Sequence, residues 1–242
     1  ILEQIKTELA SRMPAKTAKA AALFCDVYFK RVPLKQLQEG APGTLATMVA
    51  GQLKFLEKRK PGNLLIRVFN TEDVQDGGDC RHTVVELIND DLPFLVDTCR
   101  MVFQEFSLGI HLIVHPVLNI ERDDKGLLKA FSVKSGKRTR KESFIHIHVE
   151  KQTDPDVLAA LESRLKSRMA KVRTTVTDWQ PMKDRLEEVI REFDRNAPAN
   201  LSEDIRNETT DFLKWLGADH FMFIGTRTYD NVQEDGVDIL RV

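Results

Sequence analysis

The stretch "NDDLPFLVDTCRMVFQEFSLGIHLIVHPV", residues 89–117, decides the fold of this chain. It starts as an acidic loop around Pro93, and from Leu95 its apolar residues recur at helical spacing. The helical pattern ends at Leu108-Gly109, where a run rich in β-branched residues follows. The segment therefore predicts a loop, a helix and a strand, in which the loop either holds a small ligand or only begins the helix.

The sequence on both sides of this segment extends the same alternation of elements. β-branched runs bounded by turn residues predict strands over 63–70, 82–89, 110–121, 127–133, 142–150 and 172–177. Helices are expected over 95–106 and from Pro155 to about Ala170, the second capped by Thr153 or Asp154. This order predicts an α+β fold: a ferredoxin-like βαββαβ antiparallel sheet with two helices on one face.

The chain divides into three predicted parts. Residues 1–60 have helical spacing, residues 61–178 form the α+β domain, and residues 179–242 form a helical connector followed by the first strands of another domain. The chain lacks an initial methionine and stops within a β-rich run. We therefore expect it to be a piece of a longer polypeptide.

Composition limits the partners and the compartment. Lys and Arg number 36 and Asp and Glu 37, so a net charge of −1 gives no general attraction to nucleic acid or to an anionic membrane. No apolar run approaches the roughly 20 residues that span a bilayer. The three cysteines, Cys25, Cys80 and Cys99, have neither disulfide-framework nor zinc spacing. A cytoplasmic protein with no membrane or nucleic-acid partner is the simplest expectation.

The loop offers one candidate ligand site. Asn89, Asp90 and Asp91 could hold an ammonium or guanidinium group through charge-assisted hydrogen bonds, beside Phe94. The favoured alternative is that Asn89 or Asp91 caps the helix, with acidic residues offsetting its N-terminal partial charge. If the loop is only a scaffold, the Phe94 ring should be buried in the core near the helix.

Histidines form a second constellation. Strand alternation places Val85, Leu87, Ile145, Ile147, Ile110, Leu112 and Val114 on a face toward the two helices, and five of the six histidines on the other face. His111, His115, His146 and His148 are weak candidate metal ligands, since imidazoles suit zinc. They could also form a pH-sensitive contact surface. The favoured interpretation is packing against the N-terminal helices or another subunit, which should cover the apolar face around Val84, Ile113 and Phe144.

The motif "DDLPFLVDTCRMVFQEFSLGIHL" resembles the first strand–helix unit of ACT domains, regulatory modules that often bind amino acids. Asp91, Pro93, Leu95, Gly109 and Ile110 match that family, whereas Phe94 stands where ACT domains have glycine. Together with "GIHLIVHPVLNIERD", "VRTTVTDWQPM" and "WLGADHFMFIGTRTYD", residues 82–230 are similar to the N-terminal regulatory region of the large bacterial NAD-specific glutamate dehydrogenases.

The resemblance implies a parent enzyme that oxidises L-glutamate to 2-oxoglutarate and ammonium with NAD, in a homo-oligomer that could respond to an amino-acid effector. It also implies that catalytic residues lie outside this chain, which should bind no cofactor itself. The sequence agrees, since it has no G-x-G-x-x-G after a strand. Two alternatives remain open: a free-standing amino-acid sensor, and a metal-binding module built on the histidines.

Overall fold

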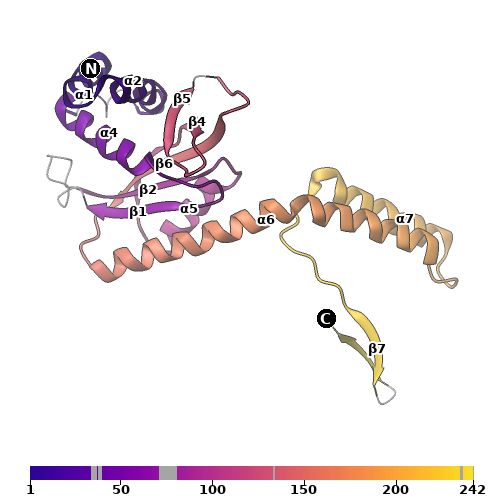
Figure 1. Ribbon diagram of the computed structural model, residues 1–242. Coiled ribbons are helices and arrows are strands. Elements are labelled where there is room, and N and C mark those ends of the chain that lie inside the picture. Colours follow the sequence, from indigo (N-terminus) through magenta and orange to yellow (C-terminus); the bar gives the residue numbers. More distant parts are fainter. Residues whose placement is uncertain (34–36, 38–39, 71–80, 133, 235–236, 242) are drawn as a thin grey trace. The chain divides into compact units, whose positions relative to one another are not determined.

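The computed structural model describes residues 1–33, 37, 40–70, 81–132, 134–234 and 237–241. The chain forms two compact units, Ile1–Ala170 and Lys171–Val242, and each is described separately (Figure 1). None of the helices in these described ranges is long and apolar enough to cross a membrane. The predicted division into 1–60, 61–178 and 179–242 stays a prediction.

The first unit begins with a layer of helices, as the apolar spacing of residues 1–60 predicts. They are α1 (Leu2–Arg12), α2 (Ala15–Phe29) and α4 (Pro42–Leu56). Pro14 precedes α2 and Pro42 is the first residue of α4. Proline is favoured at such starts because its fixed φ suits the helix and its missing N–H is not needed there.

A six-stranded antiparallel sheet follows. Its strands are β1 (Leu65–Asn70), β2 (His82–Asp90), β3 (Ile110–Val114), β4 (Val117–Arg122), β5 (Leu128–Ser132) and β6 (Arg140–Glu150). The order is β1-β2-β6-β4-β5, and β3 pairs with the other half of β6. β6 is therefore the central strand, paired from Glu142 to Glu150 with β2 on one side.

Helices α5 (Leu95–Glu105) and α6 (Pro155–Asn196) supply the other layer, on the face of the sheet opposite the N-terminal helices (Figure 1). Asp154 caps α6, since its Oδ1 accepts from the Asp156 N–H at 2.9 Å. The buried residues of α5 are Leu95, Cys99, Val102 and Phe103, spaced three and four apart. The α+β, ACT-like fold with two helices on one face is thus confirmed.

The predicted strand over 172–177 is wrong. Residues 155–196 form one helix, and β1 occupies the sheet edge beside β2. Val and Thr favour strands only where a sheet position is open to them. Here a helix already under way continues at little cost, since no Gly or Pro interrupts it before Pro181.

The predicted long strand over 110–121 is also wrong, because it divides at His115-Pro116 into β3 and β4. Proline has no N–H to donate to a sheet, although the Pro116 carbonyl accepts from the Phe144 N–H at 3.1 Å. A register shift between Ile110 and Leu112 then moves β3 by one residue. Leu112 and Val114 consequently pack with the N-terminal helices and not with α5 and α6, opposite to the predicted alternation.

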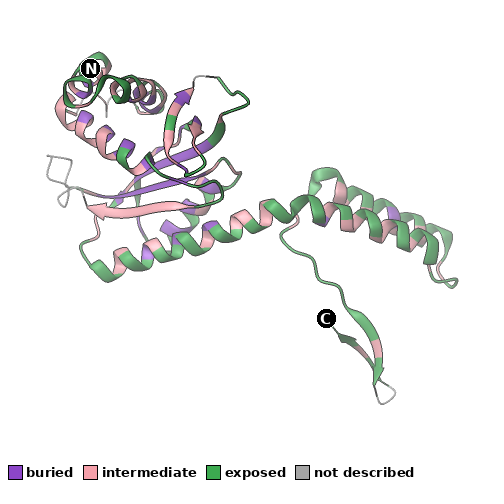
Figure 2. Ribbon diagram, viewed as in Figure 1, coloured by how far each residue is buried: buried purple, intermediate pink, exposed green. Residues whose placement is uncertain are grey.

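The N-terminal helices cover the face that carries Phe144, as predicted for residues 1–60. One core cluster joins Ile5, Phe24, Tyr28 and Leu56 to Phe144 and other strand residues. The Phe24 ring lies 5.7 Å from both Phe131 and Phe144, centroid to centroid. Figure 2 shows β2 and β6 buried between the two helix layers, so this sheet has no face open to water over its central strands.

The second unit contains the end of α6, then α7 (Glu203–Trp215), a π-turn η2 (Leu216–His220) and a hairpin of β7 (Asp230–Glu234) and β8 (Val237–Arg241). Ser202 caps α7 by accepting from the Ile205 N–H at 3.3 Å. Most of this unit is exposed (Figure 2). Its side chains therefore contribute little core of their own.

Candidate functional site

Phe94 begins α5 in a left-handed backbone conformation. It is the N-cap residue, with φ 66° and ψ 5°, and no side chain caps the helix. This conformation costs a residue with a Cβ about 1–2 kcal/mol, whereas glycine adopts it freely. The ring is 40% exposed. The prediction that Phe94 fills the core is therefore wrong, because the sharp turn into α5 leaves the ring at the surface.

Asp90 lies at the end of β2 and binds a buried arginine. Its Oδ1 accepts from Arg59 Nη2 at 2.7 Å, and its Oδ2 accepts from the Gly62 N–H at 3.1 Å. The Arg59 side chain is completely buried, and the Asp90 side chain is 29% exposed. Asp90 therefore holds the link between α4 and β1 against the sheet.

Arg59 also belongs to a larger buried ion network. Its Nη1 lies 3.1 Å from Glu142 Oε1. Arg122 donates to both Glu142 oxygens, at 2.8 and 2.9 Å, and to the carbonyls of Leu56 and Gly126, both at 3.0 Å. Such planar bidentate pairing suits Arg and stabilises a buried carboxylate. The network joins the end of α4, the β4–β5 hairpin and β6.

Asp91 and Asn89 take different positions. Asp91 is exposed, and its Oδ1 accepts from the Ser143 hydroxyl at 2.8 Å. Asn89 is 2% exposed. The prediction that Asn89 or Asp91 caps α5 is wrong, since the N-cap residue is Phe94, three residues after Asp91, and the helix starts at Leu95. The four predicted residues therefore do not converge: Asp90 binds Arg59, Asn89 is buried, and Asp91 and Phe94 reach the surface.

The surface part of the loop still has the chemistry to hold an amino acid. Asp91 supplies an accessible anion, and the uncapped N-terminus of α5 supplies N–H groups that attract a carboxylate. His115 lies close enough for the charges of Asp91 and Arg31 to act on it. Burial lowers the pKa of His115, although Asp91 opposes this. An ammonium and a carboxylate would thus meet complementary groups on one loop.

A second buried network lies on the sheet face toward the N-terminal helices. His146 is 2% exposed and Glu86 1% exposed, and His146 Nδ1 lies 2.8 Å from Glu86 Oε1. The other ring nitrogen, His146 Nε2, lies 2.8 Å from His148 Nε2. Register explains the contact, because Glu86 pairs with His146 across β2 and β6.

Several neighbours hold Glu86 in its ionised form. Arg67 Nε donates to Glu86 Oε2 at 2.6 Å, and Gln52 Nε2 donates to Oε1 at 3.2 Å. Burial alone would raise the pKa of the Glu86 carboxyl, but the His146 hydrogen bond and the Arg67 charge bring it below its usual value. Tyr28 packs edge-on against His146 at 5.9 Å. The network therefore connects α2 and α4 to the sheet.

Two more histidines continue from His148 toward the surface. The His82 ring stacks on His148 at 5.4 Å and lies 4.4 Å from His111, centroid to centroid. His111 is exposed. His115 stands apart from these four, beside Asp91. In the ranges that the structure describes, no group of three or more His, Cys, Asp or Glu side chains is arranged to hold a metal ion.

Sequence reasoning missed the ion networks. The local sequence pattern assigns no role to Arg59, Arg122, Glu142 or Glu86. One signal was available, since Glu86 and Glu142 are charged residues within predicted strands flanked by apolar neighbours. Charges at such positions are rarely buried without a partner.

Comparison with known proteins identifies the family. The family described as "Glutamate dehydrogenase, ACT1 domain" matches residues 24–165, more than half of the chain. This chain belongs to that family. The match covers the end of α2, then α4, the whole sheet, α5 and the start of α6, so it coincides with most of the first unit.

Named relatives extend the likeness over nearly the whole chain. The NAD-specific glutamate dehydrogenase of Halomonas elongata is 30% identical over 237 residues, 97% of this chain and 15% of the relative. That of Pseudomonas aeruginosa is 29% identical over 96% of this chain and 14% of its own length. That of Mycobacterium tuberculosis is 23% identical over 76% of the chain. The chain thus spans about one seventh of the first two relatives.

Proposed function

We propose that this chain is the N-terminal regulatory and subunit-contact region of a large NAD-dependent glutamate dehydrogenase. The observation that carries the proposal is the coincidence of the family match with a complete ACT-like sheet. The parent enzyme would oxidise L-glutamate to 2-oxoglutarate and ammonium while NAD is reduced. The length of the native open reading frame tests this, since a free-standing sensor would be encoded by a short one.

The proposal includes that the chain alone is not catalytic and binds no NAD. Its sequence has no dinucleotide-binding glycine motif. The buried charged side chains described above bind one another and so support the fold rather than a substrate. The purified chain should produce no NADH from L-glutamate and NAD above a no-enzyme control. Steady NADH production that scales with protein concentration would overturn this part.

We assign an amino-acid effector to the surface part of the loop, around Asp91 and Phe94. Asp91 would bind the ammonium group and the N-terminus of α5 the carboxylate. Arginine, aspartate or glutamate at millimolar concentration should then raise the melting temperature, as a ligand selective for the native state must. Asp91→Asn should abolish the shift, and Asp97→Asn, in the first turn of the same helix, should keep it. No shift with any amino acid would leave the loop as a scaffold only.

The second unit supports the subunit-contact role. Its described residues include ten large apolar side chains that are exposed: Trp179, Ile205, Phe212, Trp215, Phe221, Met222, Ile224, Tyr229, Val237 and Leu240. Apolar exposure on this scale marks an interaction surface. We propose that another subunit covers it.

Light scattering during gel filtration tests the contact. The chain should associate as its concentration rises, and Phe212→Glu should weaken this association. Asn207→Glu, on the same helix, adds the same charge at a polar exposed position and should not. A chain that stays monomeric at all concentrations would contradict the contact.

A further inference from the structure

Four histidines from three strands form one continuous cluster that reaches from the surface to the buried Glu86. His111 is exposed, His82 and His148 are half-buried, and His146 is buried. Each ring contacts the next at 4.4 to 5.4 Å between centroids. The buried end touches the helix layer, since His146 contacts Tyr28 of α2 and Gln52 of α4. The helix layer therefore packs directly on a titratable group.

Hydrogen-bond geometry restricts where protons fit. With ionised Glu86 as acceptor, His146 donates from Nδ1 and so accepts at Nε2 in its neutral form. His148 then donates from its Nε2, across the 2.8 Å that separates the two Nε2 atoms. A second proton between these atoms would set two N–H groups against each other. An extra proton on His146 would break its bond with His148.

We propose that His82, His111, His146 and His148 form a single proton-sensitive unit that holds the N-terminal helix layer on the sheet at neutral pH and loosens it under mild acid. Histidine is the side chain that normally titrates in this range. Because His146 contacts α2 and α4, a change in its charge acts directly on the packing of the helix layer.

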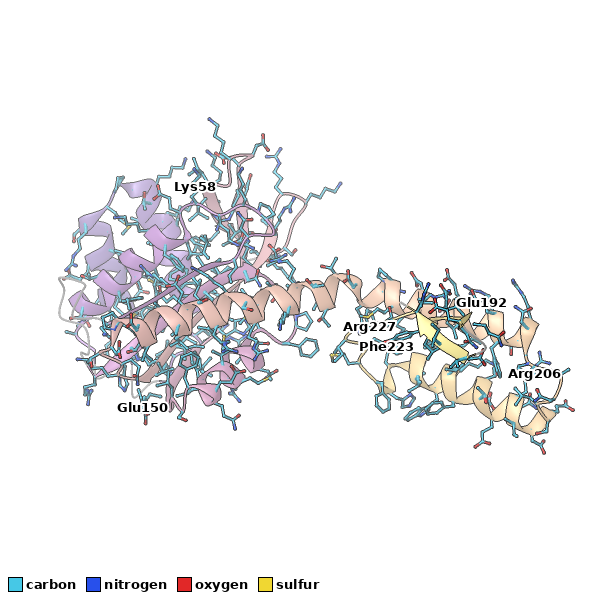
Figure 3. The ribbon with its side chains drawn as sticks, turned by 90° about the horizontal axis from the view of Figure 1, so that it is seen from below. Lys58, Glu150, Glu192, Arg206, Phe223 and Arg227 are labelled. Atoms are coloured by element: carbon cyan, nitrogen blue, oxygen red, sulfur yellow. The ribbon has the colours of Figure 1, made fainter. Side chains whose placement is uncertain are left out.

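The charges facing the cluster limit how many protons it accepts. Glu86 of β2 and Arg67 of β1 form an ion pair at the buried end. Glu150 of β6 pairs in register with His82 at the other end, on the side of the first unit opposite Lys58 (Figure 3). Tyr28 and Gln52 face the cluster from α2 and α4 as neutral groups. The two carboxylates and the guanidinium together carry one net negative charge, which balances about one proton added to the cluster. Further protons on the cluster repel one another.

The direction of the pH effect follows from linkage. In the unfolded chain each of the four histidines takes up a proton below about pH 6.5. A proton added to the folded cluster breaks the hydrogen bond between the Nε2 atoms of His146 and His148, a loss that the unfolded chain does not have. The unfolded state then binds more protons, so stability is complete above pH 6.5 and falls as the pH falls below it.

Two measurements between pH 7.5 and pH 5.5 test the proposal. The melting temperature should fall by several degrees across this range, and amide hydrogen exchange should accelerate in α2 and α4 before it does in β6. The double variant His82→Asn, His148→Gln should lose at least half of this fall. Glutamine keeps a donor for His146 and does not titrate.

Two single variants serve as controls. His220→Asn replaces a histidine of the second unit that stacks on Trp215, and it should leave the fall unchanged. His115→Asn removes a separate effect of the same sign, since burial lowers the pKa of His115. A melting temperature constant across the range, or a fall removed entirely by His115→Asn, would overturn the proposal.

If the double variant does not fold, proton NMR of the unaltered chain decides the question. The four cluster histidines should titrate as coupled, broadened curves. Four independent curves would also overturn the proposal.

Discussion

Arg59 and Asp90 form an ion pair between the chain that leaves α4 and the end of β2, with Nη2 and Oδ1 2.7 Å apart. The guanidinium is fully buried and also lies 3.1 Å from Glu142. A buried arginine between two carboxylates ties the helix layer to the sheet at the end of β6 away from the histidine cluster. It also explains why Asp90, although it stands in the acidic loop, is not available to a ligand.

Arg59→Met should destabilise the first unit by about 3–5 kcal/mol, because it leaves Asp90 and Glu142 without their shared buried partner. The free energy of unfolding from denaturant titration measures this. Lys166→Met provides the comparison, since the Lys166–Glu162 pair is solvent-exposed along α6 and should contribute less than about 1 kcal/mol. Equal losses in the two variants would show that the Arg59 network does not stabilise the fold.

Phe94 should be less favourable than glycine for the backbone. Phe94→Gly and Phe94→Ala both remove the ring, so their difference isolates the left-handed conformation at φ 66°. The glycine variant should be the more stable by about 1 kcal/mol. The same pair of substitutions at Asp97, inside α5, should give the opposite order, since alanine favours helices over glycine by about that amount. An alanine variant at position 94 as stable as the glycine variant would refute the strain.

The elements that the sequence predicts correctly are those set by local pattern. The helical spacing from Leu95 to Phe103 and the alternation of β2 and β6 each depend on neighbouring residues. Where ACT domains have glycine, the local requirement is for a left-handed residue, and Phe94 meets it at a cost in strain. The positions of Phe94 and of the α5 cap could not be predicted, because a turn's backbone angles are not visible in residue types alone.

The errors come from competition between distant segments. Residues 172–177 have strand-forming side chains, but β1 holds the sheet edge beside β2 and α6 continues through them. Likewise, Arg59 meets Glu142 only because α4, the β4–β5 hairpin and β6 come together. This pairing joins residues more than 80 positions apart. No local pattern distinguishes them from exposed charges.

Gly126 should resist substitution more strongly than Gly62. Both have φ +84°, but a Cβ on Gly126 would stand 2.6 Å from the Arg59 carbonyl oxygen, whereas nothing lies within 4 Å of one on Gly62. Gly62→Ala should therefore cost about 1–2 kcal/mol from the backbone alone. Gly126→Ala should cost about 1–3 kcal/mol more, because the backbone itself must move. Melting temperatures of the two variants compare them, and equal losses would contradict the close approach.

Glu86→Gln should make the chain less stable at pH 7, and this loss should become smaller in acid. The Glu86 pKa is lowered in the fold, mainly because His146 and Arg67 outweigh burial. A lowered carboxyl pKa stabilises the fold above the unfolded value of about 4.3, and this contribution is lost as the pH falls through the folded value. Glutamine keeps the shape but not the charge, so the loss at pH 7 should be about 1–3 kcal/mol.

Denaturant titrations at pH 7 and at pH 3.5 measure the two differences. Glu188→Gln, on the exposed part of α6, is the control and should change little at either pH. A loss at Glu86 that is as large at pH 3.5 as at pH 7 would mean that Glu86 acts through shape and not through its charge.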